Sequence, residues 1–313
     1  MTQTTHAWGH GLATSDARGN VLDVWFRTPK LGPAPVTDEL WVVPRELDAL
    51  VGEDKRRLVN THVVRTESDL TQPVSSVEDA YLRLHLLSHL LVTPNSINLE
   101  GLIGQLPIVA FSSIGSISLE DLDQLRPQLI KAGVVIHAVD KFPRMLDYVT
   151  PAKVRIADAS RVRLGAHLSP GTTVMHEGFV NFNAGTLGAS MVEGRISQGV
   201  VVGDGADIGG GASIMGTLSG GGKEKITIGK RALLGANSGV GITIGDDTVV
   251  EAGLYVTAGT KLTLITQEGE KPLKAVELSG VPNLLFRRNS LTGRVEALSR
   301  TGAGVILNKD LHP

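Results

Sequence analysis

The sequence predicts a mainly β protein organised around a parallel β-helix, with an N-terminal α/β domain and a small C-terminal β region. Three observations in residues 151–262 support this prediction. Aliphatic residues recur at every sixth position, small residues accompany them, and proline is scarce. Fixed internal periods mark repeats that bury their apolar faces only by stacking on one another. A Gly-rich flexible linker would waste the aliphatic pattern, so we reject that alternative.

The six-residue repeat has a direct geometric meaning. Three sides with one inward residue each make a triangular coil of about eighteen residues, and successive coils stack about 4.8 Å apart. Small residues suit tight corners, and strands paired on both sides need the N–H groups that proline lacks. The predicted inward positions are Ile156, Val162, Leu168, Val174, Val180, Thr186, Val192, Val202, Ile208, Ile214, Ile228, Leu234, Val240, Ile244, Val250, Val256 and Leu262.

The six-residue spacing is lengthened twice. Ten residues separate Val192 from Val202, and fourteen separate Ile214 from Ile228. Insertions in solenoid proteins map to loops on one face, which is often the binding face. We therefore expect a functional site near these two interruptions, with the longer one forming a wall of the site.

The segment 1–150 alternates predicted strands with predicted helices, as a small α/β domain does. Short strands are expected at 21–26, 40–43 and 63–65. A helix should begin at Ser75, where Glu78 completes a capping box, and end before Pro94. The remaining predicted elements are a helix from Ser118 to about Ala132, a buried strand at 134–139 and a short helix at 141–148.

Beyond the repeat, residues 263–313 change to alternating apolar and polar runs around 276, 284–286, 295–298 and 305–307. An open coil end is a sheet edge that invites aggregation. This segment is therefore expected to form a β region that caps the last coil.

Composition excludes several classes of protein. Lys and Arg number 30 against 32 Asp and Glu, so there is no bulk charge that favours nucleic acid or an anionic membrane. The absence of cysteine excludes disulfides, thiolate metal sites and a cysteine nucleophile. No basic-then-apolar leader and no apolar run of about 20 residues is present, so the expected location is cytoplasmic.

The best chemical candidate is the pair Glu193 and Arg195, at the first interruption of the repeat. On an extended segment the two side chains would project to the same side, which places an acid beside a cation. The carboxylate could accept a proton or an acyl group, and the arginine could hold a substrate carboxylate with two hydrogen bonds. A surface ion pair worth less than about 1 kcal/mol is the alternative.

Other candidates are weaker. Arg287, Arg288, Asn289 and Ser290, with Lys271 and Lys274 upstream, suit a phosphorylated ligand, but a solvated charged turn fits equally well. Four histidines could act as metal ligands or as a general base. For each of them an ordinary structural role is the favoured interpretation. These residues are His85, His89, His167 and His176.

Long strings around these residues resemble one family, the tetrahydrodipicolinate N-succinyltransferases of the actinobacterial type, over nearly the whole chain. The matching strings are 176–181, 185–194, 209–213, 235–239 and 285–290. The resemblance implies a homotrimer of left-handed β-helices, with succinyl-CoA bound between neighbouring subunits. It also implies succinyl transfer to the amine of L-2-amino-6-oxopimelate, the ring-opened hydrate of tetrahydrodipicolinate, in lysine and diaminopimelate synthesis.

The resemblance further implies roles for individual residues. The family's catalytic carboxylate corresponds to Glu193 and its neighbouring ligand arginine to Arg195. The other implied ligand contacts are Gly210, Ser213, Ala236, Glu251, Ala252, Gly259, Lys274, Arg287, Arg288, Asn289 and Ser290.

Some relatives are thought to hold magnesium on the trimer axis through a Glu that corresponds to Glu177 and an upstream Asp. Here Ser160 occupies the upstream position, with Asp158 two residues earlier. A lone carboxylate from each chain would bind a hydrated cation only weakly. Two alternative functions stay open: another acyl-CoA-dependent N-acyltransferase, with an acetyl donor or a different amine, and a structural trimer without activity.

Overall fold

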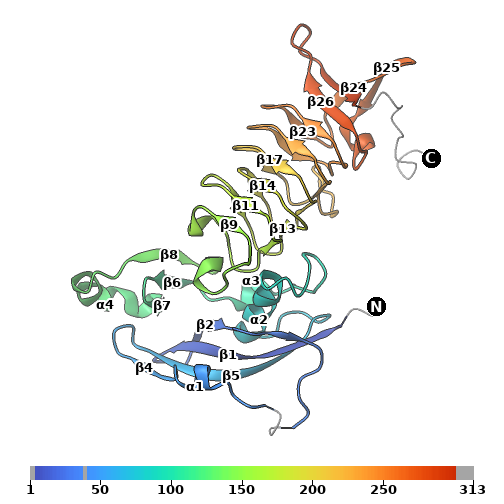
Figure 1. Ribbon diagram of the computed structural model, residues 1–313. Coiled ribbons are helices and arrows are strands. Elements are labelled where there is room, and N and C mark those ends of the chain that lie inside the picture. Colours follow the sequence, from blue (N-terminus) through green and yellow to red (C-terminus); the bar gives the residue numbers. More distant parts are fainter. Residues whose placement is uncertain (1–3, 38–40, 301–313) are drawn as a thin grey trace. The chain divides into compact units, whose positions relative to one another are not determined.

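The computed structural model describes residues 4–37 and 41–300, and the chain divides into two compact units, Met1–Thr150 and Pro151–Pro313 (Figure 1). Within the described residues, no helix is both long and apolar enough to cross a membrane. The strand expected at 305–307 lies outside the described residues.

The N-terminal unit is built on an antiparallel sheet with two long central strands, β1 (His6–Asp16) and β5 (Val59–Asp69). On its outer sides β2 (Val21–Trp25) and β3 (Lys30–Leu31) pair with β1, and β4 (Gly52–Asp54) pairs with β5. The expectation of only short strands is therefore wrong for β1 and β5, and residues 41–43 are irregular.

Strand β1 lacks the sequence pattern that is typical of a strand, because glycines occupy buried positions in it. A β-carbon on Gly11 would lie only 2.5 Å from the Val24 side chain and 2.8 Å from the Phe26 ring. The Phe26 ring and the Val24 side chain fill the space that an aliphatic side chain at position 11 would otherwise occupy. The alternation of large apolar residues that marks a strand is therefore absent from the sequence.

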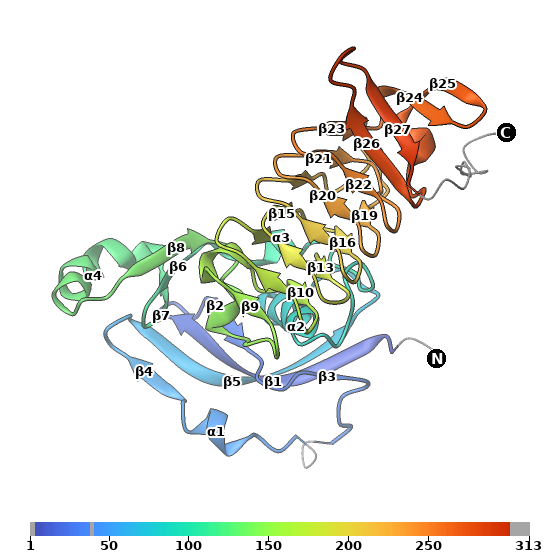
Figure 2. The ribbon, with the colours of Figure 1, turned by 45° about the horizontal axis from the view of Figure 1, so that its top comes forward.

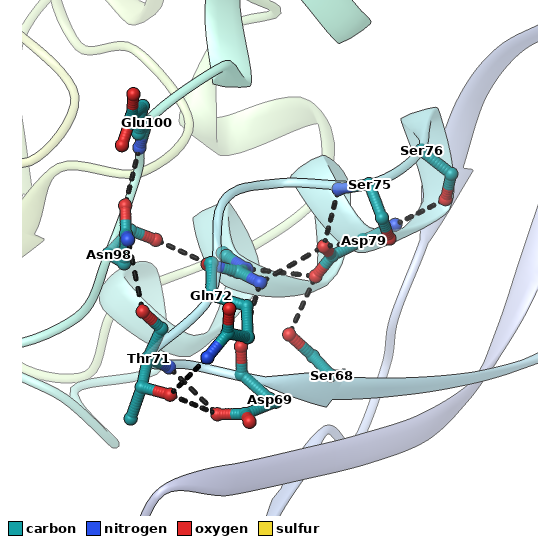
Figure 3. Close-up of polar contacts among 10 residues, drawn as sticks. Ser68, Asp69, Thr71, Gln72, Ser75, Ser76, Asp79, Asn98 and Glu100 are labelled. Atoms are coloured by element: carbon teal, nitrogen blue, oxygen red, sulfur yellow. Dashed lines mark hydrogen bonds and ion pairs between the residues drawn. The ribbon is translucent and has the colours of Figure 1, made fainter.

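Helix α2 (Val77–Ser88) is buried along almost its whole length. Its N-cap is Ser76, whose side chain accepts the N–H of Asp79 at 3.2 Å, and the Asp79 carboxylate accepts the N–H of Ser75 at 2.9 Å (Figure 3). The helix cap therefore lies one residue later than expected, at Ser76. The acid is Asp79 and not Glu78, and its carboxylate accepts the N–H of Ser75 and not that of the cap residue, so the reciprocal capping box is not formed. An aspartate at the third helical position can reach back across one turn as a glutamate does.

The same aspartate anchors a buried cation. Arg83 donates to both carboxylate oxygens of Asp79, at 2.8 and 3.0 Å, and the two side chains are only 1% and 4% exposed. The guanidinium also donates to the carbonyl oxygens of Asp69, Gln72 and Asn98. This network ties the end of β5 and two loops to the helix. Figure 3 shows Asp79 together with Asp69, Gln72 and Asn98, which belong to these segments. Burying this charge is tolerable because its donors are satisfied.

A second layer of the unit consists of a three-stranded sheet and a helix. The sheet has the order β7-β6-β8, formed by β6 (Val109–Ser112), β7 (Gly115–Ser118) and β8 (Ile136–Asp140). Helix α4 (Leu119–Lys131) begins after Ser118, as predicted, and packs Leu122, Leu125 and Leu129 against Ala110 and Ile117.

The strand expected at 134–139 exists as β8, but it is not buried. It is an edge strand, and Val135 and Val139 are 55% and 54% exposed. A short apolar run does not by itself distinguish a central strand from an edge strand. Among the described residues of the unit, three brief helical turns remain: α1 (Arg45–Asp48), α3 (Leu102–Gln105) and the 3₁₀ turn η2 (Met145–Asp147), which replaces the helix expected at 141–148.

The second unit contains the predicted parallel β-helix, with three faces that we name after their first strands (Figure 2). The β9 face contains β9 (Arg155–Ile156), β11 (Thr173–Val174), β14 (Met191–Val192), β17 (Asp207–Ile208), β20 (Leu233–Leu234), β22 (Val249–Val250) and β26 (Leu284–Arg288). The β12 face contains β12 (Phe179–Val180), β15 (Arg195–Ile196), β18 (Ser213–Ile214), β21 (Gly239–Gly241) and β23 (Tyr255–Thr257). The β10 face contains β10 (His167–Leu168), β13 (Gly185–Thr186), β16 (Val201–Val202) and β19 (Thr227–Ile228).

The inward positions of the repeat are buried as predicted from Val162 onward, and Ile156, in the first coil, is half-buried. On the β9 face, for example, Val174, Val192, Ile208, Leu234 and Val250 stand in register in successive coils. Thr186 is the polar exception, and its hydroxyl lies 2.7 Å from that of Thr172. The hydroxyl is therefore satisfied inside the apolar interior.

The two interruptions differ in kind. The first is not an insertion: Ile196 is a further inward position, fully buried, and the corner between β14 and β15 contains only Glu193 and Gly194. The corresponding corner of the next coil, 209–212, contains four residues. Only the second interruption adds chain, as a loop over 215–226 in which Thr217 and Lys225 form an antiparallel bridge.

The C-terminal strands extend the β9 face. β26 pairs in parallel with β22, and β27 (Val295–Ser299) pairs antiparallel with β26. β24 (Lys261–Thr266) and β25 (Gly269–Lys274) follow, so that ten strands form one continuous sheet. The 3₁₀ turns η3 (Ala159–Arg161) and η4 (Ala275–Leu278) lie at the two ends of this unit.

Candidate functional site

The corners that join the β9 face to the β12 face form one edge of the β-helix, here called the β9/β12 edge. In successive coils these corners are 175–178, 193–194, 209–212, 235–238 and 251–254. Five predicted site residues lie in four neighbouring corners of this edge. They are Glu193, Gly210, Ala236, Glu251 and Ala252.

Backbone hydrogen bonds hold the corners in a regular column. The N–H of Asn237 donates to the carbonyl of Gly210, and the N–H of Gly253 donates to that of Ala236, both at 2.8 Å. Asn237 adopts a positive φ of 56°, a conformation that asparagine tolerates better than most residues. At Gly209 a β-carbon would lie 2.5 Å from the Leu234 carbonyl oxygen, so glycine is required there.

The column presents unused backbone donors. Within the described residues, the N–H groups of Gly210, Ala236 and Ala252 donate to no protein acceptor, although their corner neighbours do. Gly210 is half-buried, and both alanines are exposed. Unpaired N–H groups at a surface are available to carbonyl or phosphate oxygens of a ligand.

Glu193 occupies the shortest corner of the column. Its carboxylate has no ion-pair or hydrogen-bond partner in the described parts of the chain, and its side chain is half-buried. A β-carbon on Gly210 would stand 3.4 Å from Glu193 Oε2, so the glycine leaves room beside this oxygen. The carboxylate is thus held on a short backbone segment and left open to a ligand.

Arg195 lies on the next face and not beside Glu193. It is the first residue of β15, it is exposed, and it stands in register with Ser213 of β18 and Phe179 of β12. The expectation that both side chains project from one extended segment is wrong, because the Glu193–Gly194 corner turns the chain between two faces. No ion pair joins the two residues among those described, so the alternative of a simple surface pair also fails.

The outer side of the β12 face continues this row. Gly239 follows Ser213 in register, and Tyr255 follows Gly239. A β-carbon on Gly239 would come within 2.1 Å of the Tyr255 ring, which shows that the ring lies across the glycine. Arg195 and Ser213 are therefore followed by an aromatic surface on the same face.

The turn formed by residues Arg287 to Ser290 lies at the C-terminal end of the column. Its strand β26 pairs with β22, and the N–H of Arg288 donates to Glu251 Oε2 at 2.6 Å. The Glu251 carboxylate, predicted as a ligand contact, is therefore bound to the turn. The structure thus brings Glu193, Glu251 and this turn to one edge.

One residue beside this turn was not predicted from the sequence to belong to the site. Glu296 on β27 is 1% exposed, and its carboxylate accepts hydrogen bonds from Asn289 and Arg287. These hydrogen bonds, that from Asn289 foremost, lower the pKa of Glu296 below its usual value. A glutamate inside the predicted strand run 295–298 gives no signal of a functional role until the pairing of β26 with β27 is known.

Gly259 and Lys274 belong to the opposite edge of the β12 face, which we call the β12/β10 edge. Ala258, beside Gly259, donates its N–H to Ser219 Oγ of the inserted loop at 2.7 Å. Lys274 ends β25 and is exposed, and its N–H is bound by Glu277 Oε1 at 2.8 Å. Gly259 therefore lies beside the inserted loop, and Lys274 pairs with Lys261, which follows the same corner; neither lies in a corner of the β9/β12 edge.

The candidate metal residue Glu177 lies at the β9/β12 edge, one coil before Glu193. It is exposed, and Arg161 Nη2 stands 3.3 Å from its Oε2. Asp158 accepts the Ser160 hydroxyl at 2.7 Å. In the described part of the chain, no three His, Asp or Glu side chains group as metal ligands do. One chain therefore offers a single carboxylate, already paired with a cation.

His85, His167 and His176 have the structural environments that the favoured interpretation requires, whereas the buried Nε2 of His89 has no hydrogen-bond partner among the described residues. His167 is buried on the β10 face, and His176 is exposed beside Glu177. His85 lies inside the N-terminal unit, where its Nδ1 meets the Tyr81 carbonyl at 2.8 Å and its Nε2 accepts the Phe26 N–H at 3.3 Å. Burial lowers the pKa of His85 to about 3, so it stays neutral and links α2 to β2.

Comparisons with known proteins agree with this architecture. A family model described as "Tetrahydrodipicolinate N-succinyltransferase middle" matches residues 106–144, and one described as "Hexapeptide repeat of succinyl-transferase" matches 225–258. A solved structure from Campylobacter jejuni, a putative 2,3,4,5-tetrahydropyridine-2-carboxylate N-succinyltransferase, is 32% identical with a TM-score of 0.82. It covers 96% of this chain, which in turn covers 94% of it.

Two relatives match over almost their whole lengths, and both are named 2,3,4,5-tetrahydropyridine-2,6-dicarboxylate N-succinyltransferase. The Vibrio cholerae protein is 46% identical, with 98% of each chain covered. The Pseudomonas paraeruginosa protein is 55% identical, with 100% of this chain and 99% of the relative covered. These matches confirm the resemblance and the predicted fold class, an α/β domain followed in the chain by a left-handed parallel β-helix. The chain therefore belongs to the tetrahydrodipicolinate N-succinyltransferase family.

Proposed function

We propose that this protein transfers a succinyl group from succinyl-CoA to the amine of L-2-amino-6-oxopimelate, the ring-opened hydrate of tetrahydrodipicolinate. The reaction is a step of lysine and diaminopimelate synthesis. The observation that carries the proposal is the unpaired Glu193 carboxylate on an edge that also holds free N–H groups and an arginine turn. The names of the full-length relatives supply the substrates.

Glu193 is the general base in this proposal. The neutral amine attacks the thioester carbonyl, Glu193 accepts a proton from the attacking nitrogen, and the C–S bond breaks to release the CoA thiolate, which is then protonated. Amide formation therefore balances one proton lost from nitrogen with one gained by sulfur. A carboxylate without an intramolecular partner suits this role, because no cation competes for the proton's position.

The free N–H groups of the column support binding of an extended acyl-CoA. Gly210, Ala236 and Ala252 recur once per coil, so their donors follow the axis of the β-helix. Such donors suit the amide carbonyls of a pantetheine arm and can stabilise charge on the reacting oxygen. Arg287 at the end of the column suits the phosphates of CoA, because guanidinium groups bind phosphate with two parallel hydrogen bonds.

Arg195 and Ser213 are proposed to bind a substrate carboxylate on the β12 face. Arg195 has no acidic partner among the described residues, and Ser213 stands next to it in register. A free guanidinium can form a bidentate pair with a carboxylate. A homotrimer would complete this surface with a neighbouring subunit, and the exposed Tyr255 on the same face supports such an arrangement.

Magnesium on a trimer axis has little support from this chain. Glu177 is the proposed ligand, but its pairing with Arg161 competes with a cation. No step of the proposed reaction is routed through a metal. Gly259 and Lys274 are proposed as acyl-CoA contacts from the β12/β10 edge.

A free-thiol assay with succinyl-CoA and the amine tests the proposal. We expect CoA release that requires both substrates, with succinyl-CoA turned over much faster than acetyl-CoA. Faster turnover of acetyl-CoA would favour another acyl-CoA-dependent N-acyltransferase. No release with either donor, from a folded protein, would contradict the enzyme and favour a structural trimer.

A further inference from the structure

We propose that Glu296 is a positioning residue that orients Arg287 for binding the phosphates of acyl-CoA and, through Asn289, holds the shape of the adjoining turn. The inference rests on the proposed function, because it takes acyl-CoA as the ligand of the turn at 287–290. It adds a residue, on a different strand, that determines how this turn meets its ligand.

The geometry of Glu296 is that of a fixed support. It stands directly across from Arg287 in the antiparallel register of β26 and β27. Its Oε2 accepts a hydrogen bond from Arg287 Nε at 3.0 Å and forms an ion pair with Arg287 Nη2, also at 3.0 Å, and its Oε1 accepts a hydrogen bond from Asn289 Nδ2 at 2.8 Å. The Glu296 side chain is 2% exposed, whereas that of Arg287 is 42% exposed. The carboxylate is therefore behind the arginine, and the arginine faces outward.

These contacts decide which donors remain for a ligand. Arg287 uses the Nε side of its guanidinium on Glu296, which leaves Nη1 without a protein partner among the described residues. Asn289 uses its amide nitrogen on Glu296 and its Oδ1 on the N–H groups of Leu291 and Thr292, at 3.0 and 3.1 Å. Asn289 therefore shapes the turn, and Arg287 with the exposed Ser290 is left to contact the ligand.

Electrostatics make such a support useful. Arg287, Arg288 and Arg294 crowd this turn, and like charges would push the side chains apart. Arg294 is paired with Glu270 at 3.1 Å, and Arg288 Nη1 donates to the Gly293 carbonyl. The buried Glu296 holds Arg287 in one orientation before the ligand arrives. Ligand binding then has one fewer flexible side chain to immobilise, and the smaller loss of conformational entropy favours affinity.

The decisive measurement is the dissociation constant for CoA, by titration calorimetry on the full-length protein. Glu296→Gln keeps the size of the side chain and an oxygen for Asn289, but it cannot pair with the guanidinium. We expect it to weaken CoA binding roughly tenfold and to raise the KM for succinyl-CoA similarly, with the KM for the amine unchanged. The matched control is Glu270→Gln, which breaks the exposed pair with Arg294 on the neighbouring strand. It should change CoA affinity by less than about twofold.

A second variant covers the case in which Glu296→Gln does not fold. Arg287→Lys keeps the positive charge but cannot reproduce the paired Nε and Nη2 contacts to Glu296 Oε2, and we expect a similar loss of CoA affinity. Wild-type affinity in every variant that folds would overturn the positioning role. Failure of the wild-type protein to bind CoA would instead overturn the proposed function, so the two failures are distinguishable.

Discussion

The corner 193–194 of the β9/β12 edge and the loop 215–226 of the β12/β10 edge interrupt the six-residue repeat in opposite ways. The β9/β12 edge loses two residues at Glu193–Gly194, and both of these residues donate their N–H groups to the Ile208 carbonyl. The β12/β10 edge gains the loop 215–226, which reaches the rest of the coil through contacts such as that from Ser219 to Gly241. Shortening a corner fixes a side chain on rigid backbone, whereas insertion adds a surface that can adapt.

The strongest test of this difference is removal of the carboxylate at the short corner. Glu193→Ala should lower kcat by about 10²–10⁴-fold, the usual contribution of a general base. CoA affinity measured by calorimetry should stay near that of the wild-type protein, because the column's N–H donors remain. Near-normal CoA release in the thiol assay would contradict the assignment of the base.

A second test lengthens the short corner. Inserting Gly-Ser between Glu193 and Gly194 restores the four-residue corner of the neighbouring coil and displaces the carboxylate. A shift of about 1 Å can cost about a hundredfold in rate, and we expect a loss of that size in kcat. As the matched control, the same insertion after Gly221 should change kcat less than about threefold, because loops accept added residues at little cost. Equal kcat values for the two insertions would show that corner length is unimportant.

Glycine substitutions compare the packing of the two edges. Gly209→Ala places a β-carbon 2.5 Å from the Leu234 carbonyl oxygen, whereas Gly259→Ala meets nothing within 4 Å. We expect Gly209→Ala to lower the free energy of unfolding by about 1–3 kcal/mol and Gly259→Ala to change it by less than about 0.5 kcal/mol. Urea denaturation followed by circular dichroism measures both values. Equal stabilities would mean that the column relaxes more easily than its geometry indicates.

The smallest effect should come from the loop itself. Gly220 and Gly221 have open space around them, so deleting residues 220–223 removes little packing. We expect a change in stability of less than about 1 kcal/mol. If the loop walls the acyl-CoA site, the KM for succinyl-CoA should rise roughly two- to fivefold with little change in kcat. An unchanged KM in the thiol assay would remove the loop from the site.

The repeat could be predicted because burial selects residues at fixed intervals. Ile196, which follows Val192 by four residues and not six, was missed, although the same spacing separates Val240 from Ile244. The position of Glu193 in the chain was therefore predicted, but its place on an edge and the separate face of Arg195 were not. Both follow from where the chain turns, which depends on pairing with the coils on either side.

Long-range pairing explains the other differences. Glu296 acts through its register with Arg287, and that register is set by the β26–β27 pairing. The cap of α2 lies one residue later than predicted because the Asp79 carboxylate accepts hydrogen bonds from both Ser75 and Arg83. Local motifs predict that such residues exist, but tertiary partners decide which one of two adjacent serines is used.

The registers within the β-helix also bear on how the chain folds. Most parallel neighbours are close in sequence, as in the pairing of Thr173 with Met191, whereas β1 and β5 join His6 to Asp69. Local pairings close small loops and form early, and distant ones require a larger loss of chain entropy. Coils can therefore add one after another behind the growing end of a nascent chain. The antiparallel sheet of the first unit must wait until β5 has emerged, although β1 is made first.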